Sequence, residues 1–574
     1  MPSYMKRFIT KLHISESARS WLKRLEVPQS SSKVLSRWIN NDIRPIEAKR
    51  RTWVFSTFSN SWLLTNINIS TYLTGSALIP LGLTWWRAII SIVIGNLLSA
   101  FFCVLNSLPG AYYNLGFPVV SRMVWGMWGS QFAIWNRIFL SLVWYGFTAW
   151  IGGECVYVIL QSWDPDLDQH IPNTLAEITG TTSAYFVGYV VFMLISAPFA
   201  WIRPHKLAPF FYFASTVTIV CFLALLIWAL ATMGPEGFGD TISDSAPPPA
   251  GTTSVGWLMV YGIVTTTIGA ISAGILNQND YARFAARPRH AILSQAINFP
   301  IFSIVSSVIG ILVTAATQNR FGGEAVWNPP ALLSRLIAAS PNSSGTRAAC
   351  CFAAMGLVVS QIGINVPGNA LSGGFDLAAT FPRYINIRRG AYITMVLSVV
   401  VNPWQLANTS TIFLTVLSSY SVFLGPMVGM MVSSYLSVNK RKINVDDLYI
   451  GGSKGIYWYT AGINWRSIVA FFVGCAPLLP GFISAVNLDI TVPVGTTHLY
   501  DLSFIYGFVA SGLVYFLLHF IFPARALEAF VKNDMTARQT MSHYRAKWDA
   551  VGGFGVDEGV AVQAVDGSMT PPKS

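Results

Sequence analysis

Charged residues are scarce in this chain of 574 residues, because Asp, Glu, Lys and Arg together make up only 11% of it. A soluble globular protein is about one quarter charged, so the composition argues against a water-soluble enzyme. Hydrophobic types are abundant instead, at 53% of the chain with 20 Trp and 36 Phe, which excludes a disordered chain. We therefore predict an all-α polytopic membrane protein with many interfacial aromatic residues.

Thiol and imidazole groups are few as well. The six cysteines lie in or beside apolar segments, without the spacing of a metal site or a disulfide framework, and are interpreted as packing residues. The seven histidines are scattered, which disfavours a membrane enzyme that needs clustered acid–base or metal-binding groups. A channel would need repeated filter residues, and none are visible. No metal or other cofactor is expected.

The net charge of +12 comes from basic residues in short gaps between apolar runs and in the N-terminal tail. Membrane orientation explains them better than a nucleic-acid partner does. Loops 163–183 and 234–254 carry acids but no Lys or Arg, whereas the loops that alternate with them are basic. This positive-inside bias predicts two cytosolic tails, residues 1–60 and 523–574, around a transmembrane domain of residues 61–522.

Twelve segments are long and apolar enough to be spanning helices, each of which needs ~20 mostly apolar residues. The Gly- and Pro-rich stretch 109–130 is interpreted as a re-entrant or interfacial connection. The predicted spans are 61–83, 86–108, 132–161, 184–202, 209–233, 255–277, 292–317, 348–374, 391–408, 411–436, 466–487 and 500–522.

Two of these spans have interiors that disfavour an uninterrupted helix. The first contains a polar cluster that includes Asn68 and Ser70, and the sixth has two glycines around Ser272. Helices broken at matching positions of two halves are typical of transporters with inverted repeats. We therefore predict a five-plus-five inverted repeat, with the last two helices outside it. In the alternative interpretation, the small residues only allow close helix packing.

Spans three and eight carry candidate binding residues. Trp144 and Thr148 are four residues apart and share one helix face, where an indole could stack on a planar ring and a hydroxyl could bind its edge. Asn365 and Asn369 are also four apart, with a Pro-Gly pair between them that predicts a helix break. Amides donate and accept hydrogen bonds, as the edges of a heterocycle do. The alternatives are ordinary packing for the indole and helix–helix hydrogen bonds for the amides.

Charged side chains at membrane depth are functional candidates. Glu154 lies in span three, Asp280 at the end of span six and Asp376 at the end of span eight. Asp280 is three residues from an arginine and could form only a local ion pair. Asp376 is the better proton carrier, since it lies two turns beyond Asn369, and Lys206 is its candidate partner.

With these residues the sequence resembles the nucleobase–cation symporter family 1, and within it the fungal branch of uracil, allantoin and uridine permeases. The match runs from about residue 41 to 450. The motifs that carry it are Asn41-Asp42-Ile43-Arg44-Pro45, Arg51-Thr52-Trp53, Asn68-Ile69-Ser70-Thr71, Trp144-Tyr145-Gly146, Trp150-Ile151-Gly152-Gly153, Asn279-Asp280-Tyr281-Ala282-Arg283, the run from Phe381 to Gly390, and Asn402-Pro403-Trp404-Gln405.

The resemblance implies a five-plus-five fold with two extra helices, alternating access and proton coupling. It implies that Trp144 is the stacking aromatic and Asn369 the amide on the ring edge, with Asn68 and Ser70 facing the substrate. The chain departs from the family at Thr148, where uracil and allantoin carriers typically have Gln, so that a nucleoside becomes a plausible ligand. It also lacks the Ser and Thr that sodium-coupled relatives place before the first Asn of span eight, so sodium coupling is not expected.

The resulting hypothesis is a plasma-membrane proton symporter for a nucleobase, nucleoside or allantoin-like heterocycle. The alternative keeps the fold and changes the cargo to a vitamin-type substrate, thiamine or nicotinamide riboside. Lysines near the C-terminal end are candidate ubiquitin acceptors, which would bring a ubiquitin-ligase adaptor to the cytosolic tails. Asp42 is predicted to act as a cytosolic latch on the inner gate.

Overall fold

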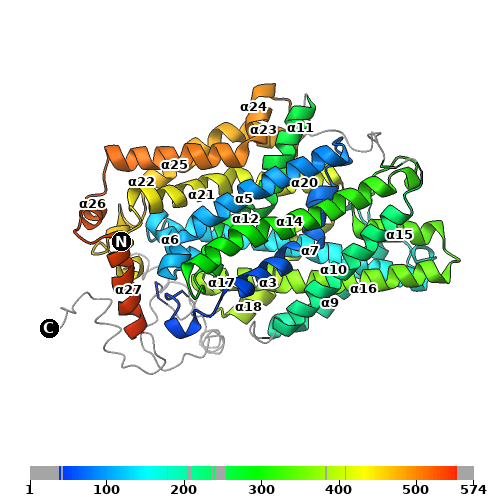
Figure 1. Ribbon diagram of the computed structural model, residues 1–574, viewed down its shortest axis with the longest axis horizontal. Coiled ribbons are helices and arrows are strands. Elements are labelled where there is room, and N and C mark those ends of the chain that lie inside the picture. Colours follow the sequence, from blue (N-terminus) through cyan, green and yellow to red (C-terminus); the bar gives the residue numbers. More distant parts are fainter. Residues whose placement is uncertain are drawn as a thin grey trace, which may run out of the picture.

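The computed structural model describes residues 38–39, 43–176, 179–202, 208–235, 237–238, 254–381, 384–406, 409–487 and 489–551. This part of the chain is helical, apart from isolated bridges that join Trp53 to Ala285 and Thr460 to Ile463. Most of the long helices run in one general direction (Figure 1). The helices α26 (Arg525–Val531) and α27 (Ala537–Val551) lie at one end of the molecule, here called the tail face, and α15 (Pro329–Ala339) lies at the opposite end.

Among the described residues, ten helices are long and apolar enough to cross a membrane. Each corresponds to one of the twelve predicted spans. Their bounds are Trp85–Tyr113 (α5), Ser130–Trp163 (α7), Ser183–Trp201 (α9), Tyr212–Ala231 (within α10, Ala208–Ala231), Val255–Leu276 (α11, η4 and α12), Pro288–Thr317 (α14), Ser344–Thr380 (α16, η6 and α17), Ile412–Val438 (most of α20, Ser410–Ser419, with α21, Ser421–Ser433, and η8), Trp465–Val486 (α22, η11 and α23) and Ser503–Ile521 (α25).

The other two predicted spans are divided into short helices. Residues 61–83 contain the end of α3 (Phe55–Asn66), all of α4 (Ile69–Ser76) and a turn. Residues 391–408 contain most of α18 (Ile387–Leu397), a single 3-10 turn and α19 (Pro403–Leu406). In the second case Asn402 takes the left-handed conformation, with φ 51°, and the proline that follows cannot continue the helix. The interruption predicted in span one is therefore confirmed, whereas the interruption in span nine was not predicted.

The predicted breaks in spans six and eight are wrong, since both helices are continuous but locally widened. The segment η4 (Tyr261–Ile268) joins α11 (Val255–Val260) to α12 (Gly269–Leu276) as a π-helix. The segment η6 (Val366–Ala370) does the same between α16 (Ser344–Asn365) and α17 (Leu371–Thr380). A π-turn accommodates the helix irregularity without ending the helix, and such turns are frequent at functional sites.

The stretch 109–130 contains no span of its own. Its first residues complete α5, and α6 (Phe117–Trp125) follows as a short helix in which all nine residues are buried. The polar stretch 523–549 contains α26 and most of α27. Helix α27 is anchored by an ion pair of Arg51 with Asp549 at 2.6 Å and one of Lys547 with Asp446 at 2.7 Å.

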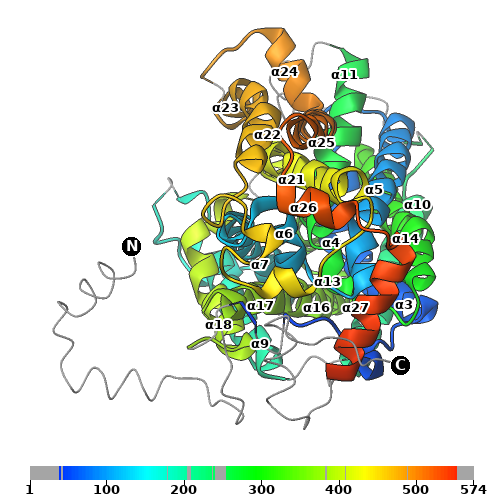
Figure 2. The same ribbon diagram turned by 90° about the vertical axis from the view of Figure 1, so that its left-hand side faces the viewer.

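The helices form two packed groups. In the first, α14 packs against α3, α4 and α5, and α5 packs against η4 and α12. In the second, α7 packs against α9, α16 and α17, and α17 packs against α18. Helix α10 contacts both α14 and α16, whereas α25 packs against α21 and α22 beside the two groups (Figures 1 and 2).

Close packing of α4 on α14 depends on two glycines, and this leads to a stability prediction. A Cβ at Gly310 would collide with the backbone oxygen of Tyr72, and a Cβ at Gly75 with that of Ser307. We expect Gly310→Ala to lower the free energy of unfolding by about 1–3 kcal/mol, because neither backbone can move aside. Thermal unfolding of the purified protein measures the effect. Gly345→Ala is the control, since a Cβ there meets nothing within 4 Å, and an equal loss in both variants would contradict the explanation.

Candidate substrate-binding site

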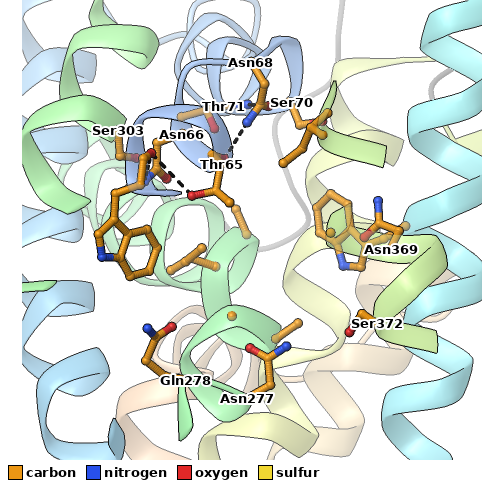
Figure 3. A pocket seen from close by; sticks show the side chains of 18 of the residues that line it. Thr65, Asn66, Asn68, Ser70, Thr71, Asn277, Gln278, Ser303, Asn369 and Ser372 are labelled. Carbon is orange, nitrogen blue, oxygen red and sulfur yellow. Dashed lines mark hydrogen bonds between the residues drawn. The ribbon is translucent and has the colours of Figure 1, made fainter. Parts of the chain in front are cut away.

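A cavity of about 210 Å³ lies between the two helix groups. The first group contributes residues of α3, α4, α12 and α13 (Asn279–Ala282), and the second contributes residues of α7, η6 and α17. Hydroxyl and amide side chains surround the space (Figure 3). Trp62 and Trp144 also line it. The lining extends from Thr74 and Thr148 at one end to Phe58 and Tyr281 toward the tail face. A polar cavity between two separately packed groups is suited to a small polar molecule.

The break in span one forms one wall of the cavity. Asn68 is the N-cap of α4: its Oδ1 accepts a hydrogen bond from the Thr71 amide at 3.1 Å, and its Nδ2 donates to the Thr65 carbonyl at 2.6 Å. Asparagine is a preferred N-cap residue, which explains why the helix restarts here. The Ser307 hydroxyl of α14 donates to the Thr71 carbonyl at 2.9 Å and so ties α4 to α14. Asn68 therefore lines the cavity and shapes it, while its own amide is bonded to backbone.

The opposite wall brings together three residues that were predicted from spans three and eight. Trp144, Thr148 and Asn369 all line the cavity (Figure 3 labels Asn369). The indole of Trp144 is held edge-on by Phe147, with ring centroids 5.9 Å apart and planes at 90°. The Nδ2 of Asn369 lies 3.5 Å from the Thr148 hydroxyl oxygen. An indole face and an adjacent amide–hydroxyl pair are thus available to one ligand.

Asn365, also predicted to bind substrate, lies behind this wall. It is fully buried and is not among the lining residues. Its Oδ1 accepts a hydrogen bond from Asn369 Nδ2 at 2.9 Å, and its own Nδ2 donates to the Tyr145 carbonyl at 3.1 Å. Asn365 therefore orients Asn369 against α7. The two amides remain within one helical turn because the helix is continuous through η6.

Of the two serines predicted to bind substrate, the one in span one lines the cavity and the one in span six does not. Ser70 lines the cavity beside Asn68 (Figure 3). Ser272 is buried outside the lining, and its hydroxyl donates to the Gly269 carbonyl of its own helix at 2.7 Å. The residues of span six that do reach the cavity include Asn277 and Gln278. Sequence reasoning missed these two, although consecutive amides at the end of an apolar run could have indicated them.

A charged network lies at the tail-face end of the cavity. Arg137 of α7 forms ion pairs with Asp280 of α13 and with Asp376 of α17, the latter with Nε and Oδ2 2.8 Å apart. Its Nη2 donates to the Ser372 hydroxyl at 2.8 Å, and Asp280 also accepts a hydrogen bond from the Phe117 amide at 2.9 Å. One guanidinium faces two carboxylates, so the three groups together carry one uncompensated negative charge.

Arg137 was not predicted, and it changes two expected pairings. Asp280 was expected to pair locally with Arg283; its carboxylate forms an ion pair with Arg137 on a different helix, and its backbone carbonyl accepts a hydrogen bond from Arg283 Nε at 3.2 Å. Asp376 was expected to pair with Lys206. Lys206 and Asp42 both lie outside the described residues, and the cation beside Asp376 in the described part is Arg137. The signal that could have found it is a single arginine within the apolar segment 132–161.

The described residues contain no group of three or more His, Cys, Asp or Glu side chains that could hold a metal ion. The cavity lining offers an indole for stacking, amides and hydroxyls for hydrogen bonding, and the Arg137 guanidinium at its charged end.

Comparison with known sequences places this arrangement in context. Residues 45–507 match the model of a family described as "Permease for cytosine/purines, uracil, thiamine, allantoin". The chain is 32% identical to the allantoin permease of Saccharomyces cerevisiae, over 84% of this chain and 76% of that protein. It is 31% identical to the uridine permease of the same organism, over 90% of this chain and 79% of that protein.

A solved structure shares the fold. The inward-facing conformation of Mhp1 superimposes with a TM-score of 0.66 at 20% sequence identity, covering 90% of this chain and 99% of that one.

Proposed function

This chain belongs to the family of permeases for cytosine/purines, uracil, thiamine and allantoin, the nucleobase–cation symporter family 1, and on that premise we propose that it takes up a nucleobase, nucleoside or allantoin-like heterocycle together with protons. It is a multi-pass integral membrane transporter and not an enzyme. We propose in addition which substrate class and coupling ion it carries, which residues bind the substrate, and that it lies in the plasma membrane.

The proposed architecture has twelve spans. Ten of them are the long helices. The other two are the interrupted segments, with the α3–α4 pair as span one and α18–α19 as span nine. Spans one to five and six to ten form the inverted repeats, and α22–α23 and α25 lie outside them. The tail face is proposed to be cytosolic, with residues 1–60 and 523–574 as tails of a plasma-membrane protein. Lys532 and Lys547 in the second tail are the proposed ubiquitin acceptors.

One observation carries the proposed substrate class: a cavity between two helix groups that offers an indole face beside an amide. A flat ring stacked on Trp144 has its edge directed at the Asn369 amide, which can donate and accept. The Thr148 hydroxyl adds a second polar contact, and Asn68 and Ser70 line the facing wall. Rocking of one group against the other would open this cavity to either side alternately, which is the usual motion of such repeats.

Proton coupling is proposed from the network at the tail-face end. Arg137 cannot neutralise both Asp280 and Asp376, so a proton on one carboxylate removes a repulsion between them. The positions just before Asn365 are Gly363 and Ile364, which have no side-chain oxygen for a sodium ion. Asp42 is retained as a proposed latch on the same end.

A vitamin-type substrate, thiamine or nicotinamide riboside, is the second candidate. The description of the matching family names thiamine beside the nucleobases. Thr148 also favours this candidate, since a short hydroxyl leaves more space beside Trp144 than a longer side chain would. A thiazolium or pyridinium ring would stack on the same indole.

The test is uptake by cells that lack their own permeases and express the full chain. Radiolabelled uracil, uridine, allantoin and thiamine are offered at several external pH values, and a protonophore is added in parallel. We expect saturable, acid-stimulated uptake of one of them. Asn369→Ala should abolish this uptake at unchanged surface abundance, because the ring edge loses its amide partner, whereas Asn342→Ala in an exposed loop should not.

Saturable uptake that is unchanged in Asn369→Ala would refute the proposed site. Uptake that is insensitive to both pH and the protonophore would refute proton coupling. Saturable uptake of thiamine alone, with no competition by unlabelled uracil, uridine or allantoin, would select the second candidate.

A further inference from the structure

Helix α7 carries a second acidic site, toward the end of the cavity that lies opposite the tail face. Glu154 is six residues beyond the lining residue Thr148, a distance of about 9 Å along a helix. Its Oε1 accepts a hydrogen bond from the Trp150 indole at 3.0 Å, and its Oε2 accepts one from Asn328 Nδ2 at 2.6 Å. Among the described residues, no Lys, Arg or His forms an ion pair with this carboxylate.

Asn328 ends a segment, residues 325–328, that is buried apart from the half-buried Trp327, leads into α15 and is here called the closing segment. Asn328 is the N-cap of α15, so the positive end of an 11-residue helix dipole lies near Glu154. The Trp327 carbonyl accepts a hydrogen bond from the Ser76 hydroxyl at 2.7 Å. The Trp327 ring also contacts Phe413 of α20, with centroids 5.4 Å apart.

The closing segment joins the two helix groups. Ser76 ends α4 of the first group, two residues after the lining residue Thr74. Glu154 belongs to α7 of the second group, and like Ser76 it lies just beyond the cavity lining. The segment is therefore bonded to both groups at the end opposite the tail face, so opening that end requires one of the two attachments to break.

We propose that Glu154 is a protonation-sensitive latch: its carboxylate, bonded to Asn328, holds the closing segment over the cavity, and protonation of the carboxylate releases it. The physical basis is the loss of charge. A hydrogen bond from an amide to a carboxylate is roughly twice as strong as one between neutral groups. Protonation also removes the attraction between the carboxylate and the positive end of α15. Glu154 is a positioning residue in this scheme, because it acts on the segment and not on the substrate.

Of the described ionisable groups around Glu154, none other is bonded to the closing segment. The Glu154 carboxylate acts electrostatically on Cys155 of α7 and on Tyr185 of α9. Asp168, the next acid along the chain, accepts a hydrogen bond from the Tyr157 hydroxyl at 2.9 Å. On α15 itself, Arg335 is engaged by Glu324 in two bonds of 2.6 Å. Only Glu154 among these groups bonds to the closing segment.

If the proposed function is taken as given, the latch links the external pH to access to the cavity. An acidic exterior would release the closing segment and expose the cavity to the side from which substrate and protons come. The Arg137 network at the other end of α7 contains a permanent cation, whereas the Glu154 contact contains none. The two ends of the cavity would then respond differently to protons.

The experiment measures the latch without any substrate. Spin labels are attached to cysteines introduced at the exposed positions Gln169 on α8 (Leu167–His170) and Ala338 on α15, in the full chain in nanodiscs. The partly exposed Cys221 and Cys351 are replaced by Ser, and the other native cysteines are buried. Electron–electron double resonance then gives the distribution of distances between the labels. The measurement is repeated from about pH 4.5 to about pH 8.5, roughly the range over which a perturbed carboxyl titrates.

We expect a single short distance at high pH and a growing longer-distance population as the pH falls. In Glu154→Gln the ratio of long to short distances at high pH should rise about five- to tenfold, the effect of exchanging a charged hydrogen bond for a neutral one. The ratio should also no longer depend on pH. Asn328→Ala removes the donor instead, and it should also raise the ratio at high pH, with a weaker dependence on pH than in the parent protein.

Glu324→Gln is the matched control, because it neutralises an exposed acid of the same region and should keep the titration of the parent protein. The proposal is overturned if Glu154→Gln keeps that titration, or if the distance is independent of pH in every variant. Failure of the uptake experiment would refute the proposed function and leave this result standing, since the distance between α8 and α15 is measured without substrate.

Discussion

Trp144→Ala should raise the KM of the transported heterocycle about 5- to 150-fold, the factor that corresponds to about 1–3 kcal/mol for stacking of a base on an aromatic side chain. Trp144 lines the cavity from α7, and Phe147 holds its ring edge-on at 5.9 Å, so the indole has a defined orientation before substrate arrives. Replacement by Ala removes the face but leaves Asn369 in place. Initial rates of radiolabelled uptake over a range of substrate concentrations measure the change.

The same helix supplies the matched control. Trp163 is the last residue of α7 and is 69% exposed, so Trp163→Ala removes an equal side chain away from the cavity. We expect this variant to keep the KM of the parent protein at equal surface abundance. Trp144→Phe should recover part of the affinity, because a smaller aromatic face remains. Unchanged KM in Trp144→Ala would show that the indole does not contact the substrate.

Arg137→Ala should be the most destabilising of these substitutions, with a loss of about 3–5 kcal/mol in the free energy of unfolding. The Arg137 side chain is 5% exposed, and its partners Asp376 and Asp280 are 1% and 19% exposed. Removing the guanidinium leaves the two carboxylates without the cation that they share. A buried charge without its partner costs far more than an intact pair contributes. Thermal unfolding of the purified protein, or its loss from the cell surface, measures the effect.

The control for this variant is an ion pair of similar geometry at the surface. Arg335 and Glu324 are 44% and 47% exposed, and Arg335→Ala should change the free energy of unfolding by about 1 kcal/mol or less. Combining Arg137→Gln with Asp280→Asn and Asp376→Asn should recover much of the lost stability, since no uncompensated charge remains. An Arg137→Ala protein as stable as the parent would contradict the network.

The local sequence was sufficient for most of the spans, because the bilayer selects helices by length and hydropathy alone. It was insufficient for their continuity. The run around Asn68 does end one helix and start another, and there the cap is local, because the Asn68 side chain bonds to residues three positions away. In span eight the Pro-Gly pair produces a π-turn and no break. That outcome depends on the helices packed around it, which no local pattern contains.

The site divides along the same line. Sequence spacing determined that Trp144 and Thr148 share a helix face, and that Asn369 lies one turn from Asn365, because helix periodicity is a local property. Only the tertiary structure decided that Asn369 reaches Thr148 across two helices, that Asn365 supports it from behind and that Ser272 lies outside the cavity. The contacts of Asp280 and Asp376 with Arg137 are likewise decided by the fold alone. The same is true of the contact between Asn328 and Glu154. These contacts join residues 143 to 239 positions apart in the chain, and separations of that size leave no periodic trace in a single sequence.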